Sequence, residues 1–150
     1  MLKQVNYQDK AVDELVEKVI RLLNASGQRK RLVFKAPTGS GKTVMASGML
    51  ARLAQELPER TDNLVNRVAF IWIAPNKLHE QSYFKMKNYF TESRLLRPVV
   101  YDELDQSVDG YIRPGEILFV NWESINKDNA LMIRETERSA SLYDITDRTQ

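Results

Sequence analysis

The chain has 150 residues, a net charge of +2, 43% hydrophobic residues and 28% charged residues, which fits one domain or part of one. It has no cysteine and a single histidine, His79, which excludes disulfides and cysteine-based zinc or redox sites and argues against a histidine metal cluster. No apolar run reaches the length of a membrane span and the N-terminus lacks the basic-then-apolar layout of a signal peptide, so we expect a cytoplasmic protein with no membrane partner.

The first expected element is a helix over residues 8–26. Its apolar residues recur three and four positions apart, which is typical of one buried helical face. Gly27 is a plausible stop for this helix, and residues 28–31 read as a short basic loop. The expected buried face comprises Val12, Leu15, Val16, Val19, Ile20 and Leu23.

The next segment has the order strand, glycine-rich loop and helix. Residues 31–35 (RLVFK) predict a buried strand, and residues 36–43 read APTGSGKT. A polyphosphate is wrapped by backbone N–H groups, so the chain must curl tightly, which Gly39 and Gly41 allow. The positive end of the following helix would then face the phosphates. The expected nucleotide-binding residues of this loop are Thr38, Gly39, Ser40, Gly41, Lys42 and Thr43.

Two side chains of the loop carry the expected chemistry. Lys42 supplies a compact positive charge for the β- and γ-phosphates and is the candidate catalytic residue. Thr43 supplies a hydroxyl to Mg²⁺, which prefers oxygen ligands and keeps several waters.

Tyr7 and Gln8 precede the first helix. The amide of Gln8 suits the edge of adenine, and the ring of Tyr7 could stack on the base. Their position alone leaves open that neither residue contacts the base.

The following elements predict an α/β fold. A helix to about Leu57 is expected, with an apolar face of Met45, Met49, Leu50, Leu53 and Leu57, and a polar connection over residues 58–66. The apolar run 67–74 reads as a strand buried on both faces of a parallel sheet. The alternation of helices and strands predicts a three-layer parallel sheet with helices on both faces.

The carboxyl ends of the strands are the expected ligand edge of this sheet. The phosphate loop and residues 74–77 should share that edge, with Asn76 capping a helix that runs to about Phe90. Asn76 and Lys77 are candidates for contact with a nucleic-acid backbone. The mixture of lysines and aromatic residues over 77–90 could stack bases, but aromatic residues in the core with lysines in solvent explain it better.

The second half of the chain contains two more expected strands. Residues 98–101 are a short candidate strand. The following Asp102, Glu103 and Asp105 look like a magnesium-binding Walker B segment, but we interpret this likeness as a decoy, because the apolar run before them is short and begins with Pro98. Residues 109–116 are rich in turn residues, 116–121 (EILFVN) predict a strong strand, and 130–143 predict a weaker helix.

These motifs together resemble superfamily 2 DEAD/DEAH-type helicase-like ATPases. APTGSGKT resembles their motif I, Tyr7–Gln8 their Q motif, and APNKLHEQ (74–81) their motif Ia. EILFVNWESIN (116–126) is similar to the segment before motif II in the restriction-enzyme branch. The resemblance is closest to the Res (helicase/nuclease) subunit of type III restriction enzymes and covers nearly the whole chain.

The resemblance implies a RecA-like P-loop motor that uses ATP and Mg²⁺ to move on double-stranded DNA, with a methyltransferase/specificity subunit as partner. It implies that Gln8 reads adenine, and that residues near the ligand edge contact DNA. These are Pro75, Asn76, Lys77, Asn121, Trp122 and Ser124.

Motif II and the second RecA-like domain with its arginine finger are not identified. We therefore expect residues 1–150 to be the N-terminal part of the first RecA-like domain, with weak nucleotide binding and little hydrolysis. An incomplete parallel sheet also predicts self-association through an exposed edge.

Four other classes of protein are alternatives to a motor. A GTPase is disfavoured because residues 76–79 and 126–129 lack the final Asp of the guanine-reading NKxD pattern. A small-molecule kinase is disfavoured because the sequence shows no sign of a substrate pocket or an Arg-rich lid. A dinucleotide-binding dehydrogenase is disfavoured because Val44 stands where its loop would need a third glycine. The alternative that stays open is a non-catalytic nucleotide-binding module that regulates or binds a partner.

Overall fold

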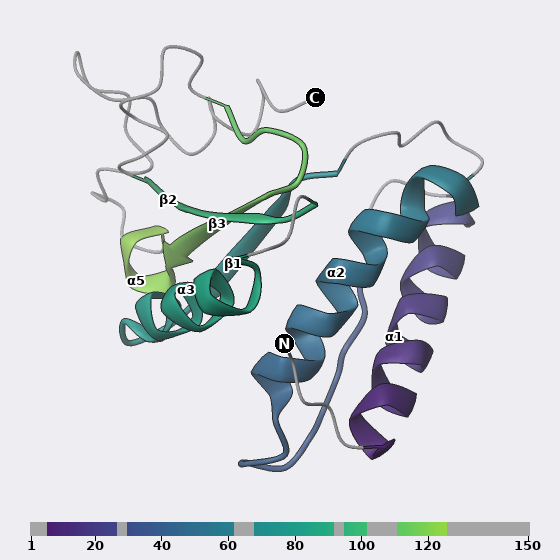
Figure 1. The fold of residues 1–150 in the computed structure, drawn as a ribbon, viewed down its shortest axis with the longest axis horizontal. Coiled ribbons are helices and arrows are strands. Elements are labelled where there is room, and N and C mark those ends of the chain that lie inside the picture. Colours follow the sequence, from purple (N-terminus) through teal and green to yellow (C-terminus); the bar gives the residue numbers. More distant parts are fainter. Residues whose placement is uncertain (1–5, 27–29, 62–67, 92–94, 102–110, 126–150) are drawn as a thin grey trace. The chain divides into compact units, whose positions relative to one another are not determined.

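The structure is a computed structural model that describes residues 6–26, 30–61, 68–91, 95–101 and 111–125 (Figure 1). The chain divides into two compact units, Met1–Val68 and Ala69–Gln150. The expected helix over 130–143 and the acidic decoy that starts at Asp102 lie outside the described residues. In the described part, no helix is long and apolar enough to cross a membrane.

The first unit is built from two helices, α1 (Asn6–Asn24) and α2 (Lys42–Arg60). They lie side by side and run in the same direction, with a long connection that returns from the end of α1 to the start of α2 (Figure 1). The predicted apolar face of α1 is confirmed at four positions, whereas Val19 is only partly buried and Leu23 is exposed. The confirmed positions are Val12, Leu15, Val16 and Ile20.

Helix α2 extends through Pro58 to Arg60, beyond the predicted end at Leu57. A proline in a helix removes one backbone donor, so Pro58 leaves one hydrogen bond of the last turns unmade. Thr61 closes the helix, because its backbone N and its Oγ1 both donate to the carbonyl oxygen of Leu57, at 3.2 and 2.8 Å. The apolar face of α2 buries Met45, Leu50, Leu53 and Leu57, while Met49 is only partly buried.

The prediction of a buried strand over residues 31–35 is wrong. This segment forms no strand, and Leu32, Val33 and Phe34 are 40%, 75% and 38% exposed. A strand is stabilised by hydrogen bonds to a neighbouring strand, and the described residues of the first unit contain none. The two helices of this unit bury their apolar faces against each other instead.

The second unit contains the predicted parallel sheet. Strands β1 (Phe70–Ala74), β2 (Arg97–Val100) and β3 (Glu116–Asn121) are all parallel, in the order β1-β3-β2. The bounds of β3 are those predicted. Helices α3 (Leu78–Tyr89) and α5 (Trp122–Ile125) complete the described elements (Figure 1).

Strand β3 lies in the core of this unit. On one face, Phe119 packs against Tyr83 of α3, with ring centroids 5.7 Å apart. On the other face, Leu118 and Val120 cluster with Val99 and Ile112. The central position of β3 therefore explains why its apolar run is continuous.

Strand β1 is not buried on both faces, contrary to the prediction. Trp72 lies 6.1 Å from Phe119 between ring centroids, but Ile71 and Ile73 on the opposite face are exposed. The reason is that β1 forms an edge of the described sheet, with α3 packed on the face that carries Trp72 and Phe119.

Candidate functional site

The loop before α2 has the tight curl that its sequence predicts. Gly39 and Gly41 adopt φ angles of 80° and 85°, in the left-handed region that glycine tolerates best. Ser40 closes the turn, because its backbone N and its Oγ donate to the carbonyl oxygen of Pro37 at 3.3 and 2.8 Å. The loop therefore reverses the chain just before the helix begins.

The N-terminus of α2 supplies backbone donors to this loop. The first helical hydrogen bond runs from the N–H of Met45 to the carbonyl oxygen of Gly41, at 2.9 Å. The N–H groups of Lys42, Thr43 and Val44 therefore lie in the turn whose donors have no acceptor within the helix. Three such donors at the positive end of a 19-residue helix suit an anionic ligand.

Lys42 folds back over the loop. Its Nζ donates to the carbonyl oxygens of Ala36 and Pro37, at 2.9 Å each. The ammonium is exposed and held by neutral acceptors, so a phosphate oxygen could replace either carbonyl at little cost. Thr43 follows on the first turn of α2, where its side chain is partly buried.

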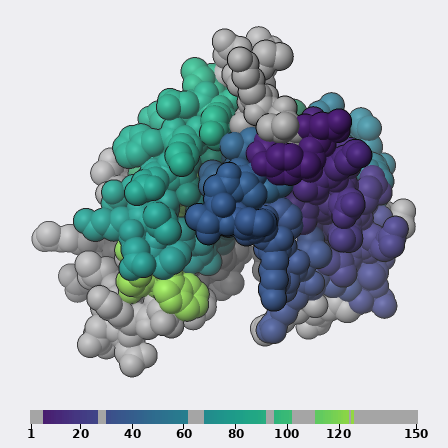
Figure 2. Space-filling model, turned by 90° about the horizontal axis from the view of Figure 1, so that it is seen from below, coloured from purple at the N-terminus to yellow at the C-terminus, as the bar shows by residue number. Residues whose placement is uncertain are grey.

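Tyr7 and Gln8 contact the same loop through a backbone carbonyl. The Tyr7 hydroxyl and the Gln8 Nε2 both donate to the carbonyl oxygen of Ser40, at 2.9 and 3.0 Å. Gln8 is only 7% exposed, whereas Tyr7 is exposed. Figure 2 views the molecule from the side on which the starts of α1 and α2 lie next to each other. The structure thus brings Tyr7, Gln8 and the phosphate loop together.

The described loop fits a nucleotide polyphosphate with Mg²⁺. A Cβ on Gly41 would lie 2.3 Å from Gln8 Nε2, so the position of the Gln8 side chain against the loop depends on glycine there. A Cβ on Gly39 would meet no heavy atom within 4 Å, so that residue lies in open space. The set of backbone N–H donors, one ammonium and one hydroxyl is the chemistry that phosphate oxygens and a hard cation require.

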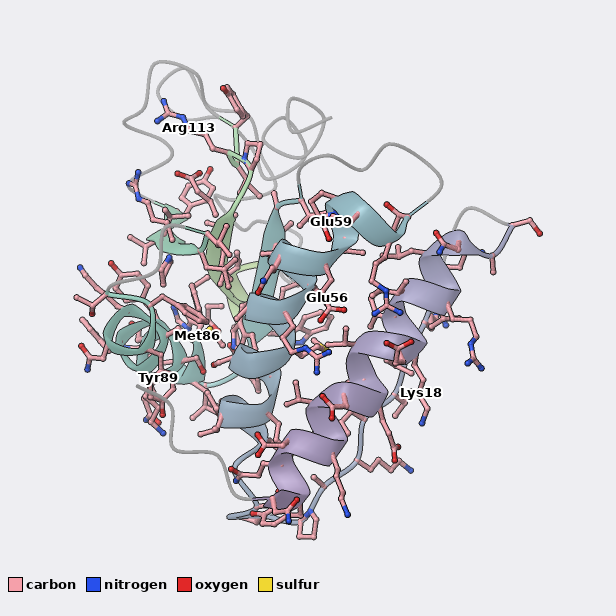
Figure 3. The ribbon with its side chains drawn as sticks, turned by 45° about the vertical axis from the view of Figure 1, so that its right-hand side comes forward. Lys18, Glu56, Glu59, Met86, Tyr89 and Arg113 are labelled. Atoms are coloured by element: carbon pink, nitrogen blue, oxygen red, sulfur yellow. The ribbon has the colours of Figure 1, made fainter. Side chains whose placement is uncertain are left out.

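An ionic network joins the two helices that carry these residues. Arg60 of α2 donates to Glu17 of α1 at 2.7 and 2.9 Å and to Glu56 at 2.7 Å, and Arg52 pairs with Asp13 of α1. Hydrogen bonds from Arg60 lower the pKa of the Glu17 and Glu56 carboxyls below their ordinary value. Figure 3 shows Glu56 on the side of α2 that faces α1.

The second group of predicted residues lies in the other unit, at the carboxyl ends of β1 and β3. Asn76 donates its backbone N–H to Glu123 Oε1 at 2.9 Å, and the N–H of Glu123 lies 3.4 Å from Asn121 Oδ1. The two strand ends therefore meet, as a parallel sheet requires. Sequence reasoning missed Glu123, although an acid in the stretch after a predicted strand was a visible signal.

The start of α3 differs from the prediction. Lys77, not Asn76, is the N-cap residue, and its side chain makes no capping hydrogen bond. Both residues have left-handed backbones, with φ angles of 51° and 59°. Asn76 therefore lies one residue before the N-cap position, in a sharp turn of the backbone, and its side-chain amide does not cap α3.

For the remaining predicted residues at this edge, the structure gives the exposure of the side chain. Pro75, Lys77 and Trp122 are exposed, and Asn121 is partly buried. The side chain of Ser124 lies outside the described residues. The prediction that this edge is shared with the phosphate loop stays a prediction, because each unit is described by itself.

The parallel sheet and the glycine-rich loop that opens a helix define a small α/β protein compatible with part of a RecA-like fold. A family model described as "Type III restriction enzyme, res subunit" matches residues 1–148, so the chain belongs to that family. The family is helicase-like and is associated with ATP-dependent function in restriction systems. No curated protein and no solved structure matches the chain.

Proposed function

We propose that this chain is the ATP-binding portion of an ATP-dependent DNA helicase or translocase that moves on double-stranded DNA. The observation that carries the proposal is the loop over residues 36–43, with left-handed Gly39 and Gly41, followed by Lys42 and Thr43 on the first turn of α2. Membership of the restriction-enzyme family supports a motor over other users of phosphate loops.

The proposed roles follow from the chemistry of each group. The backbone N–H groups at the start of α2 and the Lys42 ammonium bind the β- and γ-phosphates, and the Thr43 hydroxyl is a ligand for Mg²⁺. Bound Mg²⁺ would neutralise phosphate charge. Lys42 leaves the carbonyl oxygens of Ala36 and Pro37 when it takes a phosphate oxygen.

DNA contacts are proposed at the carboxyl ends of β1 and β3. Backbone N–H groups and exposed lysines are the usual donors to DNA phosphates. The residues proposed for this role are Pro75, Asn76, Lys77, Asn121, Trp122 and Ser124. The proposed protein partner is a methyltransferase/specificity subunit, and residues 1–150 would form the N-terminal part of the first RecA-like domain.

The first experiment measures nucleotide binding and turnover by the purified chain. Mg-ATP binding is followed by calorimetry, and phosphate release is followed with and without double-stranded DNA. Lys42→Ala is the test variant, and Lys35→Ala is the matched control because Lys35 is an exposed lysine just before the loop. We expect Lys42→Ala to weaken Mg-ATP binding about tenfold or more, and Lys35→Ala to change it less than about twofold.

Three outcomes separate the possible functions. Binding that requires Lys42, with turnover raised by DNA, supports the motor. Binding that requires Lys42 without any turnover fits an incomplete motor or the alternative, a non-catalytic nucleotide-binding module. Absence of Mg-ATP binding contradicts the proposal at its first step.

Self-association is a separate part of the proposal. It is supported by exposed apolar side chains on β1, Ile71 and Ile73, beside an edge of the described sheet. Sedimentation of the chain at rising concentration tests it, and a monodisperse monomer throughout would rule it out.

A further inference from the structure

The turn between β1 and α3 contains two residues with an unusual backbone. Asn76 and Lys77 have φ angles of 51° and 59°, and in the described part of the chain they are the non-glycine residues with a positive φ. The left-handed region brings the Cβ of such a residue close to the following carbonyl oxygen, so it persists where surrounding contacts hold it. The turn therefore needs contacts that fix its shape.

This turn is held both from within and from a neighbouring element. The N–H of Leu78 donates to the carbonyl oxygen of Pro75 at 2.9 Å, which closes the turn locally. The N–H of Asn76 donates to Oε1 of Glu123 at 2.9 Å, which joins the turn to α5. An ionised acceptor makes a stronger hydrogen bond than a neutral carbonyl does. The carboxylate of Glu123 is thus a strong contact to the first of the two left-handed residues.

The sheet positions Glu123 beside this turn. Strand β3 pairs in parallel with β1, and Ala74 at the end of β1 lies opposite Asn121 at the end of β3. Glu123 follows two residues after Asn121, on α5, and its own N–H lies 3.4 Å from Asn121 Oδ1. Figure 1 shows α5 next to α3 at this end of β3. The strand register therefore sets the place of the carboxylate independently of the turn.

Lys77 is the residue whose position depends on the turn. Its side chain is exposed and makes no capping hydrogen bond to α3, while its carbonyl oxygen accepts the N–H of Glu80 at 3.1 Å. The backbone of Lys77 is thus held by α3 on one side and by the bond between Asn76 and Glu123 on the other. A fixed backbone limits the directions that the ammonium can take, which favours contact with a phosphate at one place.

A carboxylate at this edge would by itself oppose DNA binding. Glu123 and a DNA phosphate are both negative, and like charges at close range repel each other. The hydrogen bond of Glu123 favours a fixed Lys77, whereas its charge disfavours a nearby phosphate. The two properties therefore predict opposite effects on DNA affinity, and variants can separate them.

We propose that Glu123 is a positioning residue, whose carboxylate holds the left-handed turn of Asn76 and Lys77 and so places the Lys77 ammonium for a phosphate of double-stranded DNA. The DNA part of this inference rests on the proposed function, because it uses the same edge of the sheet. The structural part, that the carboxylate holds the turn, rests on the contacts alone.

The first measurement is amide hydrogen exchange at Asn76, followed by NMR in the full chain. Glu123→Ala removes the acceptor of this N–H, and Glu123→Gln keeps an acceptor oxygen without the charge. We expect Glu123→Ala to speed the exchange of Asn76 about tenfold or more, and Glu123→Gln to change it less than about threefold. The amides of β1 that pair with β3 are the reference and should exchange as in the unchanged chain.

The exchange data decide the structural part of the inference. Unchanged exchange of Asn76 in Glu123→Ala would mean that the carboxylate does not hold the turn. Equal acceleration at Asn76 and throughout β1 would mean that Glu123 supports the whole sheet and has no particular role at the turn. Either result overturns the proposal.

The second measurement is the affinity of the same chains for a fluorescent DNA duplex at two salt concentrations. Glu123→Ala should raise the Kd about threefold or more, because Lys77 loses its fixed position. Glu123→Gln should leave the Kd unchanged or lower it, because it removes a repulsion and keeps the bond. Glu80→Ala is the matched control, an exposed acid in the first turn of α3 that is not the acceptor of the Asn76 N–H, and it should not raise the Kd.

The binding data decide the DNA part. An unchanged or lower Kd in Glu123→Ala, as in Glu80→Ala, would mean that Glu123 does not position Lys77 for DNA. An equal rise of the Kd in Glu123→Gln and Glu123→Ala would mean that the charge is needed and not the hydrogen bond. A chain that binds no duplex at low salt would refute the proposed DNA edge and the DNA part of this inference with it, while the exchange of Asn76 would still decide the structural part.

Discussion

Gln8 donates a hydrogen bond from Nε2 to the carbonyl oxygen of Ser40, which lies 32 residues further along the chain, at 3.0 Å. The bond ties the first turn of α1 to the middle of the phosphate loop. Because Gln8 is almost fully buried, its amide lies where it can hold the loop in shape. This contact predicts that Gln8 positions the loop, which the sequence pattern did not indicate.

Replacing Gln8 by Ala should therefore weaken the loop. We expect a loss of about 1–2 kcal/mol in the free energy of unfolding, from one hydrogen bond and a buried acceptor left without it. ATP and GTP should lose affinity by a similar factor, because both present the same phosphates to the loop. Calorimetry with both nucleotides measures this; a loss confined to ATP would instead mean that Gln8 reads adenine.

The two glycines of the loop should respond differently to alanine. In Gly41→Ala the new Cβ would lie 2.3 Å from Gln8 Nε2 at a φ of 85°, so both strain and a clash arise. In Gly39→Ala the φ of 80° gives strain, but no heavy atom lies within 4 Å. We expect Gly39→Ala to cost about 1 kcal/mol in unfolding free energy and Gly41→Ala clearly more.

Urea unfolding of the two variants and the unchanged chain tests this difference. The double variant Gln8→Ala/Gly41→Ala should recover part of the cost of Gly41→Ala, because it removes the clashing amide. Equal losses for Gly39→Ala and Gly41→Ala would contradict the close approach of the Gln8 side chain to Gly41.

The sequence predicted best those features that depend on neighbouring residues in the chain. The left-handed glycines follow from the motif, and β3 follows from a continuous apolar run, with the same bounds of 116–121. Residues 31–35 have a similar apolar pattern but form no strand. Pattern alone does not separate the two cases, because strand formation depends on a neighbour: β3 has two paired strands, and 31–35 has none among the described residues of its unit.

The parts of the site that were missed depend on tertiary contacts or on backbone shape. The bond between Gln8 and Ser40 joins residues far apart in sequence, and that between Asn76 and Glu123 joins two strand ends. The left-handed backbone of Lys77 has no side-chain signature, because lysine is common at positions of every shape. The residue types at these sites were visible, but their geometry was not.

The network around Arg60 predicts a pH dependence of stability. Its hydrogen bonds lower the pKa of Glu17 and Glu56 below their ordinary value of 4.5. Groups whose folded pKa is lowered stabilise the fold above the unfolded pKa, and this contribution disappears as the pH falls through the folded value. The free energy of unfolding should therefore fall as the pH drops below about 4.5.

Arg60→Met should flatten this pH profile. At neutral pH the variant should be less stable than the unchanged chain, and the two should converge once both carboxyls are protonated. Lys18→Met is the control, because Lys18 pairs with Glu14 at 3.7 Å on the exposed surface of α1, where an ion pair contributes little (Figure 3). Parallel profiles for Arg60→Met and the unchanged chain, from urea unfolding at several pH values, would refute this account.

Lys77 should show a conflict between stability and DNA binding. Its φ of 59° is strained for a residue with a Cβ, so Lys77→Gly should raise the free energy of unfolding by up to about 1 kcal/mol. The same change removes an exposed charge at the proposed DNA edge. Affinity for double-stranded DNA should fall, and the slope of log K against log salt should decrease in magnitude by about 1.

Two further variants separate charge from backbone shape. Lys77→Asn removes the charge but keeps a residue that tolerates the left-handed region, so it should lower DNA affinity as Lys77→Gly does. Lys85→Ala removes another exposed lysine from α3 and should leave the salt slope unchanged. If Lys77→Gly keeps full DNA affinity while it raises stability, neither the charge nor the backbone of Lys77 contributes to DNA binding, and the DNA contact lies elsewhere.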